Sequence, residues 1–412
     1  MDVALIWIVS LAGIALMLVR PRGLPEYVWA GSGALLLVAL RLISGRVALH
    51  AVHQGLDVYL FLAGMMILAE LAREEGVFDW IAQIAVSHAR GSAARLFFWV
   101  YASGVVVTAL LSNDATAIVL TPAVLAAVRR ARVDARPHLL ACALVANAAS
   151  FLLPISNPAN LVVFGSRLPP LGAWLGALLL PSLVSIAATF LILRFLSRRR
   201  LAQPVAAADE IRRLTRPGRF AFAGVLLAAA AMLLASGFGI PLGWPTFVAA
   251  LVAMLLVASQ DRSAPLTAIR HASWSILPLV AALFVLVAAL NQAGMMPAAQ
   301  AAIAWMGRQP HQIAKFSGAF AVAGLSNLMN NLPVGLAAGS SLRQAGHTGL
   351  LARAVLVGVD LGPNLSVTGS LATILWLIAL RREREEITAG QFLRIGVIVM
   401  PAALALALLV LR

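Results

Sequence analysis

The sequence predicts an all-α protein that crosses a membrane many times. Of its 412 residues, 61% are hydrophobic and 11% are charged, whereas a soluble domain carries about 25% charged residues. Largely apolar runs of roughly 17–23 residues recur along the chain, and each is long enough to cross a ~30 Å hydrocarbon core as a helix. The runs do not alternate between apolar and polar residues, as the strands of a membrane barrel would.

The first apolar run, residues 3–19, begins directly after Met1 and Asp2. No basic segment precedes it, and no small-x-small cleavage site follows it. We therefore expect a membrane helix that is retained, rather than a signal peptide.

One long polar stretch, Ser197–Arg219, divides the chain almost in half and contains the run Arg198-Arg199-Arg200. We expect a first membrane repeat over residues 1–196, a basic linker over 197–219, and a second, inverted membrane repeat over 220–412.

Each half has the same expected order of elements. Three apolar helices come first, at residues 3–19, 27–43 and 57–72, and again at 220–236, 245–259 and 273–291. A short amphipathic segment follows, at 77–88 and at 297–307. Two apolar segments joined by a break come next, at 95–111 and 115–128, and again at 311–326 and 332–342. A long interrupted segment and a final helix close each half, at 138–165 and 171–193, and again at 350–380 and 391–411.

The breaks correspond best between the two halves. Asn113-Asp114-Ala115-Thr116 aligns with Asn330-Asn331-Leu332-Pro333, and residues 156–160 lie near the counterpart of residues 368–370. If each Asn-containing break is the tip of a re-entrant hairpin, the chain has about ten spanning helices, two of them broken, and two hairpins. Inverted repeats with broken helices place a substrate site near the middle of the membrane.

The distribution of basic residues predicts the orientation. With the first terminus outside, only eight of the 31 basic residues fall outside: Arg41, Arg46, Arg167, Arg308, Lys315, Arg343, Arg353 and Arg412. This asymmetry satisfies the positive-inside rule. We expect a multi-pass protein of the cell (inner) membrane, in contact with lipid, with the basic linker in the cytoplasm.

The four breaks are the expected site, because irregular backbone inside lipid is costly unless it lines a cavity or contacts other protein. Asp114 lies between apolar runs, far in sequence from any arginine. An intramembrane carboxylate of this kind can exchange a proton, although it can also act only as a helix cap. Asp360 is the second intramembrane acid, with the same two interpretations.

Polar side chains at the breaks are the expected substrate contacts, with capping or bonding between helices as the alternative. They are Asn113, Thr116, Asn157, Asn160, Asn327, Asn330, Asn331, Asn364, Thr368 and Ser370. Asp57 and Glu70 flank one helix and are expected to anchor it at the membrane interface. The single cysteine, Cys142, is expected to pack between helices.

Several function classes lack their motifs. The net charge of +15 is accounted for by arginines at helix ends, rather than by nucleic-acid binding. No GxxxxGK[ST] motif for ATP and no Gly-x-Ser-x-Gly or His-Glu-x-x-His enzyme motif is present. One cysteine without clustered histidines predicts no structural zinc site, and we expect no catalytic residue, resident metal or cofactor.

The same breaks carry a resemblance to a known family. Asn113-Asp114-Ala115-Thr116 with Thr121-Pro122, and Asn330-Asn331-Leu332-Pro333, resemble the two hairpins of the arsenite and antimonite efflux permeases, which belong to the ion-transporter superfamily. The run from Asp360-Leu361-Gly362-Pro363-Asn364 to Gly369-Ser370-Leu371-Ala372-Thr373 is the most specific part. Asn364 stands where these permeases often carry lysine.

The resemblance implies a secondary transporter that exports arsenite and antimonite against protons, in some members with a separate soluble ATPase subunit on the cytoplasmic side. Two acids at the breaks would repel a carboxylate substrate and suit a neutral metalloid hydroxide with a counter-proton. A sodium/proton antiporter on the same scaffold is the main alternative, and a carboxylate carrier is a further one.

Overall fold

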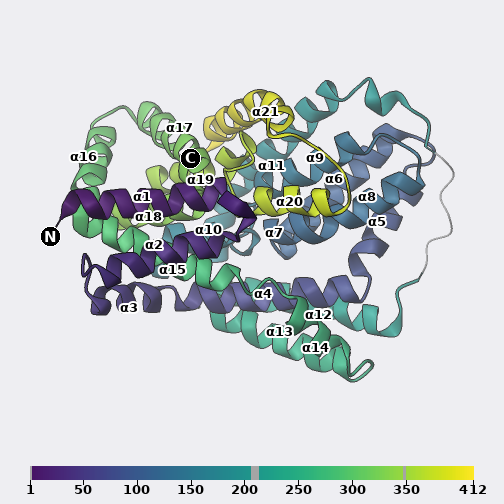
Figure 1. The fold of residues 1–412 in the computed structure, drawn as a ribbon. Coiled ribbons are helices and arrows are strands. Elements are labelled where there is room, and N and C mark those ends of the chain that lie inside the picture. The colour runs from purple at the N-terminus through teal and green to yellow at the C-terminus, as the bar shows by residue number, and fades with distance from the viewer. Residues whose placement is uncertain (1, 206–212, 347–348) are drawn as a thin grey trace.

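The computed structural model describes residues 2–205, 213–346 and 349–412. Within these ranges every regular element is a helix, and the β pairing amounts to one isolated bridge between Ser92 and Pro204. The all-α fold that the sequence predicts is therefore confirmed (Figure 1).

The helices before the first break are α1 (Val3–Val19), η1 (Pro21–Gly23), α2 (Glu26–Ala39), α3 (Gly45–Gln54), α4 (Leu56–Glu74), α5 (Val77–His88) and α6 (Ala93–Leu110). The helices from the first break to the linker are α7 (Asn113–Ala115), the π-helical η2 (Thr116–Leu120), α8 (Thr121–Arg130), α9 (Ala135–Ala148), η3 (Pro154–Ser156), α10 (Pro158–Phe164), η4 (Gly165–Arg167) and α11 (Leu171–Leu196).

The linker contributes η5 (Arg200–Ala202), and its residues 206–212 lie outside the described ranges. The second half begins with α12 (Arg216–Gly237), α13 (Gly243–Ala258), α14 (Ala264–His271), α15 (Ile276–Leu290), the π-helical η6 (Asn291–Met295) and α16 (Met296–Gly307). It ends with α17 (His311–Met329), α18 (Asn331–Gln344), α19 (Leu350–Leu361), η7 (Gly362–Asn364), α20 (Leu371–Arg382) and α21 (Ala389–Val410).

Several helices are long and apolar enough to cross a membrane. Among the described residues five segments pass by length and composition: α6, α11, α12, α21 and the run Ala264–Met306. The pair α3 and α4, bent by 50° at a short break, adds a sixth, and α1, α2 and α13 are shorter apolar helices. The protein is thus a multi-pass membrane protein. The predicted count of ten crossings and the inverted relation of the halves stay predictions.

Two short amphipathic helices were missed in the sequence. The expected helix at 27–43 ends at Ala39, and Ser44 then caps the separate helix α3 by accepting a bond from the Val47 amide at 3.3 Å. Similarly, α14 precedes α15 within residues 260–272, where no element was predicted from the sequence. Neither α3 nor α14 contains a long apolar run, so hydropathy alone does not reveal them.

The opening helices of the two halves pack together. In Figure 1, α4 runs along the lower side of the molecule, with α12, α13 and α14 beside it. This layer also contains α1, α2 and α15, which contact one another. A second group is formed by α6, α9, α11 and α21, and a third by α10, α17, α18 and α19. The breaks lie between these groups and the first layer.

Small residues allow α19 to approach α17 closely. Gly358 and Gly362 are four residues apart and therefore lie on one face of the helix. A Cβ atom on Gly362 would lie 2.6 Å from the Cα of Ala323 in α17. Paired small residues at this spacing allow membrane helices to come into close contact. Here they place the break that follows α19 next to the last third of α17.

Candidate functional site

The first hairpin turns at residues 110–113, and its turn is fixed by local side chains. Ser112 caps α7, because its hydroxyl accepts a hydrogen bond from the Ala115 amide at 3.1 Å. The side-chain oxygen of Asn113 accepts from the Asp114 amide at 2.9 Å. The chain then continues as the π-helix η2, and the Thr121 hydroxyl donates to the Thr116 carbonyl at 3.0 Å. These bonds satisfy backbone groups that the break would leave unpaired.

The second hairpin turns at Asn330, whose φ of 73° lies in the left-handed region. Its ψ of 150° places it outside the αL well, in a backbone conformation that glycine adopts far more readily than asparagine. Its side-chain oxygen accepts from the Leu332 amide at 3.3 Å and so caps α18. The Asn331 amide donates to the Gly369 carbonyl at 2.9 Å, which joins this tip to the break between α19 and α20.

The two broken helices restart at capping residues. Asn157 caps α10 by accepting from the Ala159 amide at 3.0 Å, and Pro158 occupies the first helical position, where no amide is needed. Ser370 caps α20 by accepting from the Thr373 amide at 3.1 Å. Helices α7, α10, α18 and α20 therefore all begin at the breaks, and their N-terminal ends carry partial positive charge.

All four breaks meet at one small central cavity. It is lined by Asn113, Asp114, Asn157, Asn331 and Ser370, together with apolar residues that include Leu62 of α4 and Ile276 of α15. Its volume of about 10 Å³ is room for about one water molecule. Since no basic side chain is among these described lining residues, Asp114 faces amides, a hydroxyl and helix N-termini.

A second cavity of about 50 Å³ adjoins the first and shares Asp114 with it. Its walls are Ser112 and Ile118 of the first hairpin, Met66 and Glu70 of α4, and Ser273 between α14 and α15, among other residues. Asp114 is partly exposed to this space, and its carboxylate makes no hydrogen bond within the described part of the chain. Of the two acids at the breaks, Asp114 is thus the one whose carboxylate lines cavity space and has no hydrogen-bond partner among the described residues.

Asp360 occupies a different environment. It is fully buried, and its Oδ1 accepts a hydrogen bond from Asn157 Nδ2 at 2.8 Å. Ser150 approaches the same carboxyl, but its hydroxyl donates to the Asn147 carbonyl at 2.8 Å. The Oδ2 atom has no hydrogen-bond partner among the described residues. Asp360 thus links the break before α10 in the first half to the break after α19 in the second half through its hydrogen bond with Asn157.

The remaining predicted residues lie around the cavities without lining them. Thr116 bonds to Thr108 at 2.8 Å, and Asn160 donates to the Ser150 carbonyl at 2.9 Å. Asn327 donates to the Gly362 carbonyl at 2.8 Å, and the Thr368 hydroxyl donates to the Asn327 carbonyl at 2.9 Å. Together with the capping residue Asn330, these side chains hold the shape of the breaks in this structure.

Asn364 belongs to a buried network that the sequence did not reveal. Asn147 Nδ2 donates to Asn364 Oδ1 at 3.0 Å and lies 3.4 Å from Thr373 Oγ1. The Ser370 hydroxyl donates to Asn147 Oδ1 at 3.4 Å. Asn147 connects both broken helices, although a lone amide in an apolar helix is its only signal in the sequence.

Asp57 has a structural partner on another helix. Its Oδ1 accepts from the Gly243 amide at 2.8 Å and so caps the start of α13. Leu62, Ile276 and Glu70 line the cavities and were not predicted as site residues. The two apolar residues have no distinguishing signal in the sequence, since each lies within an ordinary apolar run.

Comparison with known proteins agrees with this fold. The citrate transporter family model, CitMHS, matches residues 2–358. The arsenical pump membrane protein of Yersinia enterocolitica is 28% identical over 406 residues, covering 92% of this chain and 91% of that one. A protein of the same name from Escherichia coli is 29% identical over 412 residues, covering 93% and 92%. The predicted resemblance to this group is therefore confirmed.

A solved transporter shares the fold. The YdaH transporter of Alcanivorax borkumensis superposes with a TM-score of 0.57 at 18% identity, covering 88% of this chain and 86% of that one. Because the family model spans most of the chain and the fold is that of a membrane transporter, this protein belongs to the citrate transporter family, CitMHS, of secondary transporters.

Proposed function

We propose that this protein exports arsenite and antimonite across the cell membrane in exchange for protons that bind Asp114. The observation that supports this proposal most strongly is the lining of the central cavity, where the partly exposed carboxylate of Asp114 faces neutral hydrogen-bonding groups. Similarity to the arsenical pump membrane proteins supports the choice of cargo.

The chemistry of the cavities argues for a neutral cargo. Arsenite at neutral pH is mainly the uncharged trihydroxide, which can both donate and accept hydrogen bonds. The amides of Asn113, Asn157 and Asn331 and the hydroxyl of Ser370 offer both kinds of partner. Citrate is a multiply charged anion, and neither cavity has an arginine, lysine or histidine among its described lining residues to neutralise it.

In the proposed cycle, the site binds one metalloid hydroxide from the cytoplasm while Asp114 releases its proton there. After reorientation, the cargo leaves outside, and Asp114 takes up a proton from that side. The inward proton gradient then drives export, because the proton and the cargo move in opposite directions across the same site.

Transport by inverted membrane vesicles tests the cargo and the coupling ion together. With an acidic lumen, As(III) should accumulate inside, and a protonophore should abolish the accumulation. Citrate offered under the same gradient should not accumulate. If a sodium gradient drives As(III) uptake while a pH gradient does not, or if citrate is the transported species, this function is wrong.

The sodium/proton antiporter remains the competing assignment, since carboxylate and carbonyl oxygens also bind Na⁺. Sodium-dependent alkalinisation of the same vesicles without any metalloid would favour it. Metalloid-dependent alkalinisation of the lumen, at constant sodium, would favour the exchange proposed here.

A further inference from the structure

Glu70 lines the same cavity as Asp114. Both carboxylates border the same space of about 50 Å³, together with the hydroxyl-bearing residues Ser112 and Ser273. A water molecule occupies about 10–15 Å³ on this measure, so the space holds about three or four. Two carboxylates and two hydroxyls give such waters the polar partners that they require.

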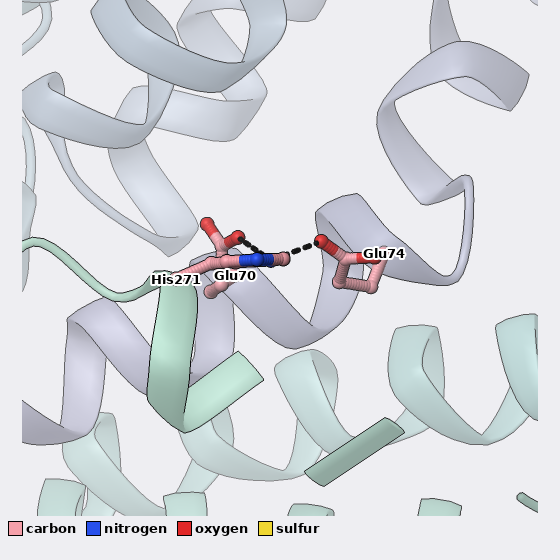
Figure 2. Close-up of side chains that lie close together, drawn as sticks. All are labelled: Glu70, Glu74 and His271. Atoms are coloured by element: carbon pink, nitrogen blue, oxygen red, sulfur yellow. Dashed lines mark hydrogen bonds and ion pairs between the residues drawn. The ribbon is translucent and has the colours of Figure 1, made fainter. Parts of the chain in front are cut away.

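Glu70 is held from one side only. Arg73 Nε donates to Glu70 Oε1 at 2.9 Å, and Arg73 Nη2 bonds to the same oxygen. His271 Nδ1 lies 4.0 Å from Oε1 as well, and 3.1 Å from Glu74 Oε1. Figure 2 shows Glu70, Glu74 and His271 close together where α14 meets α4. Every one of these contacts uses Oε1, so Oε2 has no hydrogen-bond partner in the described part of the chain.

Glu70 is the inner member of this group. Its side chain is 12% exposed, whereas those of Arg73 and His271 are 44% and 57% exposed. The group therefore reaches from solvent, through His271 and Arg73, to a carboxylate that borders the internal cavity.

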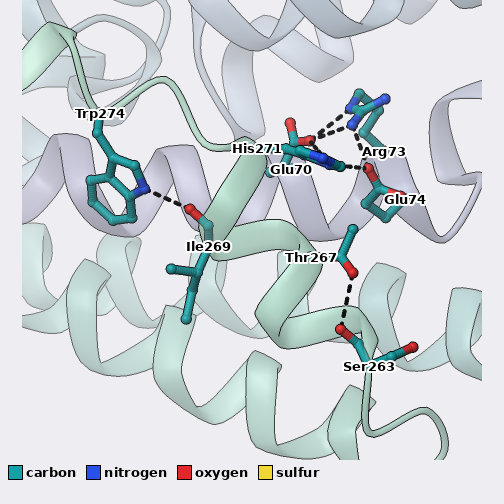
Figure 3. Close-up of polar contacts among 8 residues, drawn as sticks. All are labelled: Glu70, Arg73, Glu74, Ser263, Thr267, Ile269, His271 and Trp274. Atoms are coloured by element: carbon teal, nitrogen blue, oxygen red, sulfur yellow. Dashed lines mark hydrogen bonds and ion pairs between the residues drawn. The ribbon is translucent and has the colours of Figure 1, made fainter.

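The residues that directly follow α14 form part of one wall of that cavity, and local bonds stabilise the conformation of α14 and of this segment (Figure 3). The Thr267 hydroxyl donates to the Ser263 carbonyl at 3.1 Å, and Trp274 Nε1 donates to the Ile269 carbonyl at 2.6 Å. Ala272 and Ser273, which follow α14 directly, line the cavity. His271 thus joins the wall of the cavity to α4.

The same group does not suit a resident metal ion. Glu70, Glu74 and His271 offer ligand atoms within 4.8 Å of one another. However, Arg73 is bonded to both carboxylates, so a guanidinium cation already offsets one of their two negative charges. A metal ion would have to displace this guanidinium before it could reach the oxygens that Arg73 holds.

We propose that Glu70 is the proton-exchanging residue at the mouth of a hydrated passage, and that it passes protons between solvent and Asp114. This inference rests on the proton coupling proposed above. Arg73 and Glu74 of α4 and His271 of α14 face Glu70 directly, and Asp79 of α5 acts on Arg73. Arg73 holds Oε1 in place, while Oε2 accepts a proton from one cavity water and returns it to another.

The matched pair Glu70→Gln and Glu74→Gln tests the relay. Both variants remove a carboxylate bonded to Arg73, but only Glu70 lines the cavity. We expect Glu70→Gln to lower net, pH-driven As(III) flux by about tenfold or more, because a positioned proton-transfer group contributes at least that much. Exchange of internal for external As(III) at equal pH needs no net proton transfer and should persist. Glu70→Asp should restore part of the net flux, and Glu74→Gln should stay close to the unsubstituted protein.

The relay is refuted if Glu70→Gln keeps its net flux, if it loses exchange together with net flux, or if Glu74→Gln is impaired equally. The last two results would mean that the group only fastens α14 to α4. Asp114→Asn is measured in parallel. If that variant keeps full net flux, the proposed function fails and the relay with it, whereas failure of the Glu70 result alone leaves the proposed function standing.

Discussion

The two intramembrane acids differ in what surrounds them. Asp114 is partly exposed to two adjoining cavities and makes no side-chain hydrogen bond among the described residues, whereas Asp360 is fully buried and bonded to Asn157. A proton carrier must exchange with water on each side of the membrane in turn, which Asp114 can do without breaking protein contacts. We therefore assign coupling to Asp114 and the linking of the two breaks to Asp360.

Cys142 carries the one thiol of the chain, and thiolates bind trivalent arsenic. Tight capture by thiolates uses two or three sulfurs, and this chain has one cysteine. Cys142 is buried, with 1% of its surface exposed, and lines neither cavity at the breaks. It precedes Asn147 by about 7 Å of helix rise.

We predict that Cys142→Ser retains near-normal arsenite resistance. Placing a hydroxyl at this buried position should cost about 1–2 kcal/mol of stability at most. Growth on arsenite, measured with immunoblots of the membrane fraction, tests this. A variant that reaches the membrane in normal amounts but gives no resistance would show that recognition through hydroxyl groups is the wrong mechanism.

At the scale of elements, the contact between α17 and α19 positions both breaks of the second half. The side-chain Nδ2 of Asn327, near the end of α17, donates to the Gly362 carbonyl at 2.8 Å. The backbone amide of Asn331 donates to the Gly369 carbonyl at 2.9 Å. These bonds require the close approach that Gly362 allows.

We predict that Gly362→Ala destabilises the protein by about 1–3 kcal/mol, because the added methyl overpacks a close helix contact. Gly324 of α17 is the matched control, since a Cβ atom there would meet nothing within 4 Å. Gly324→Ala should be neutral or stabilising by up to about 1 kcal/mol. Thermal unfolding of both variants in detergent measures the difference, and equal melting temperatures would contradict the packing argument.

The sequence predicts where the helices and breaks lie better than it predicts which side chains point into the cavity. The apolar runs gave α1 and α5 with their observed bounds, and the Asn, Pro and Gly residues marked the breaks. Asn330 and Asn331 are adjacent, yet one caps a helix and the other lines the cavity. That difference depends on the positive φ of Asn330 and on the hydrogen bond from the Asn331 backbone amide to the Gly369 carbonyl, which no local sequence pattern encodes. Glu70 was interpreted as an interfacial anchor because it and Asp57 flank one apolar helix in the sequence.

At the scale of the molecule, residues of α4 line two separate cavities, one toward each end of the helix. The cavity at its Glu70 end reaches Asp114. A cavity of about 170 Å³ at its other end is lined by Asp57, Leu161 and Gly165, among others, and by no residue of the hairpin tips. Helix α10 lies between them, since Pro158 borders the first cavity and Leu161 the second. The site in this structure is therefore reached from the Glu70 end of α4.

We predict that the Glu70 end and the basic linker share the cytoplasmic side. Single cysteines at Gln203 and Thr215, in a Cys142→Ser background, should react with an impermeant thiol reagent only in inverted vesicles or permeabilised cells. Cysteines near either terminus should react in intact cells. Labelling of Gln203→Cys from outside intact cells would overturn this orientation and, with it, the direction of transport.

The central claim is that Asp114 carries the coupled proton. The most direct measurement is proton flux during As(III) transport by purified Asp114→Asn and unsubstituted protein in liposomes, with a pH-sensitive dye inside. The amide preserves the size of the side chain but cannot exchange a proton, so As(III) addition should move protons only in the unsubstituted protein, and Asp114→Glu should recover part of the signal. Unchanged As(III)-dependent proton flux in Asp114→Asn, at equal protein content, would contradict the account.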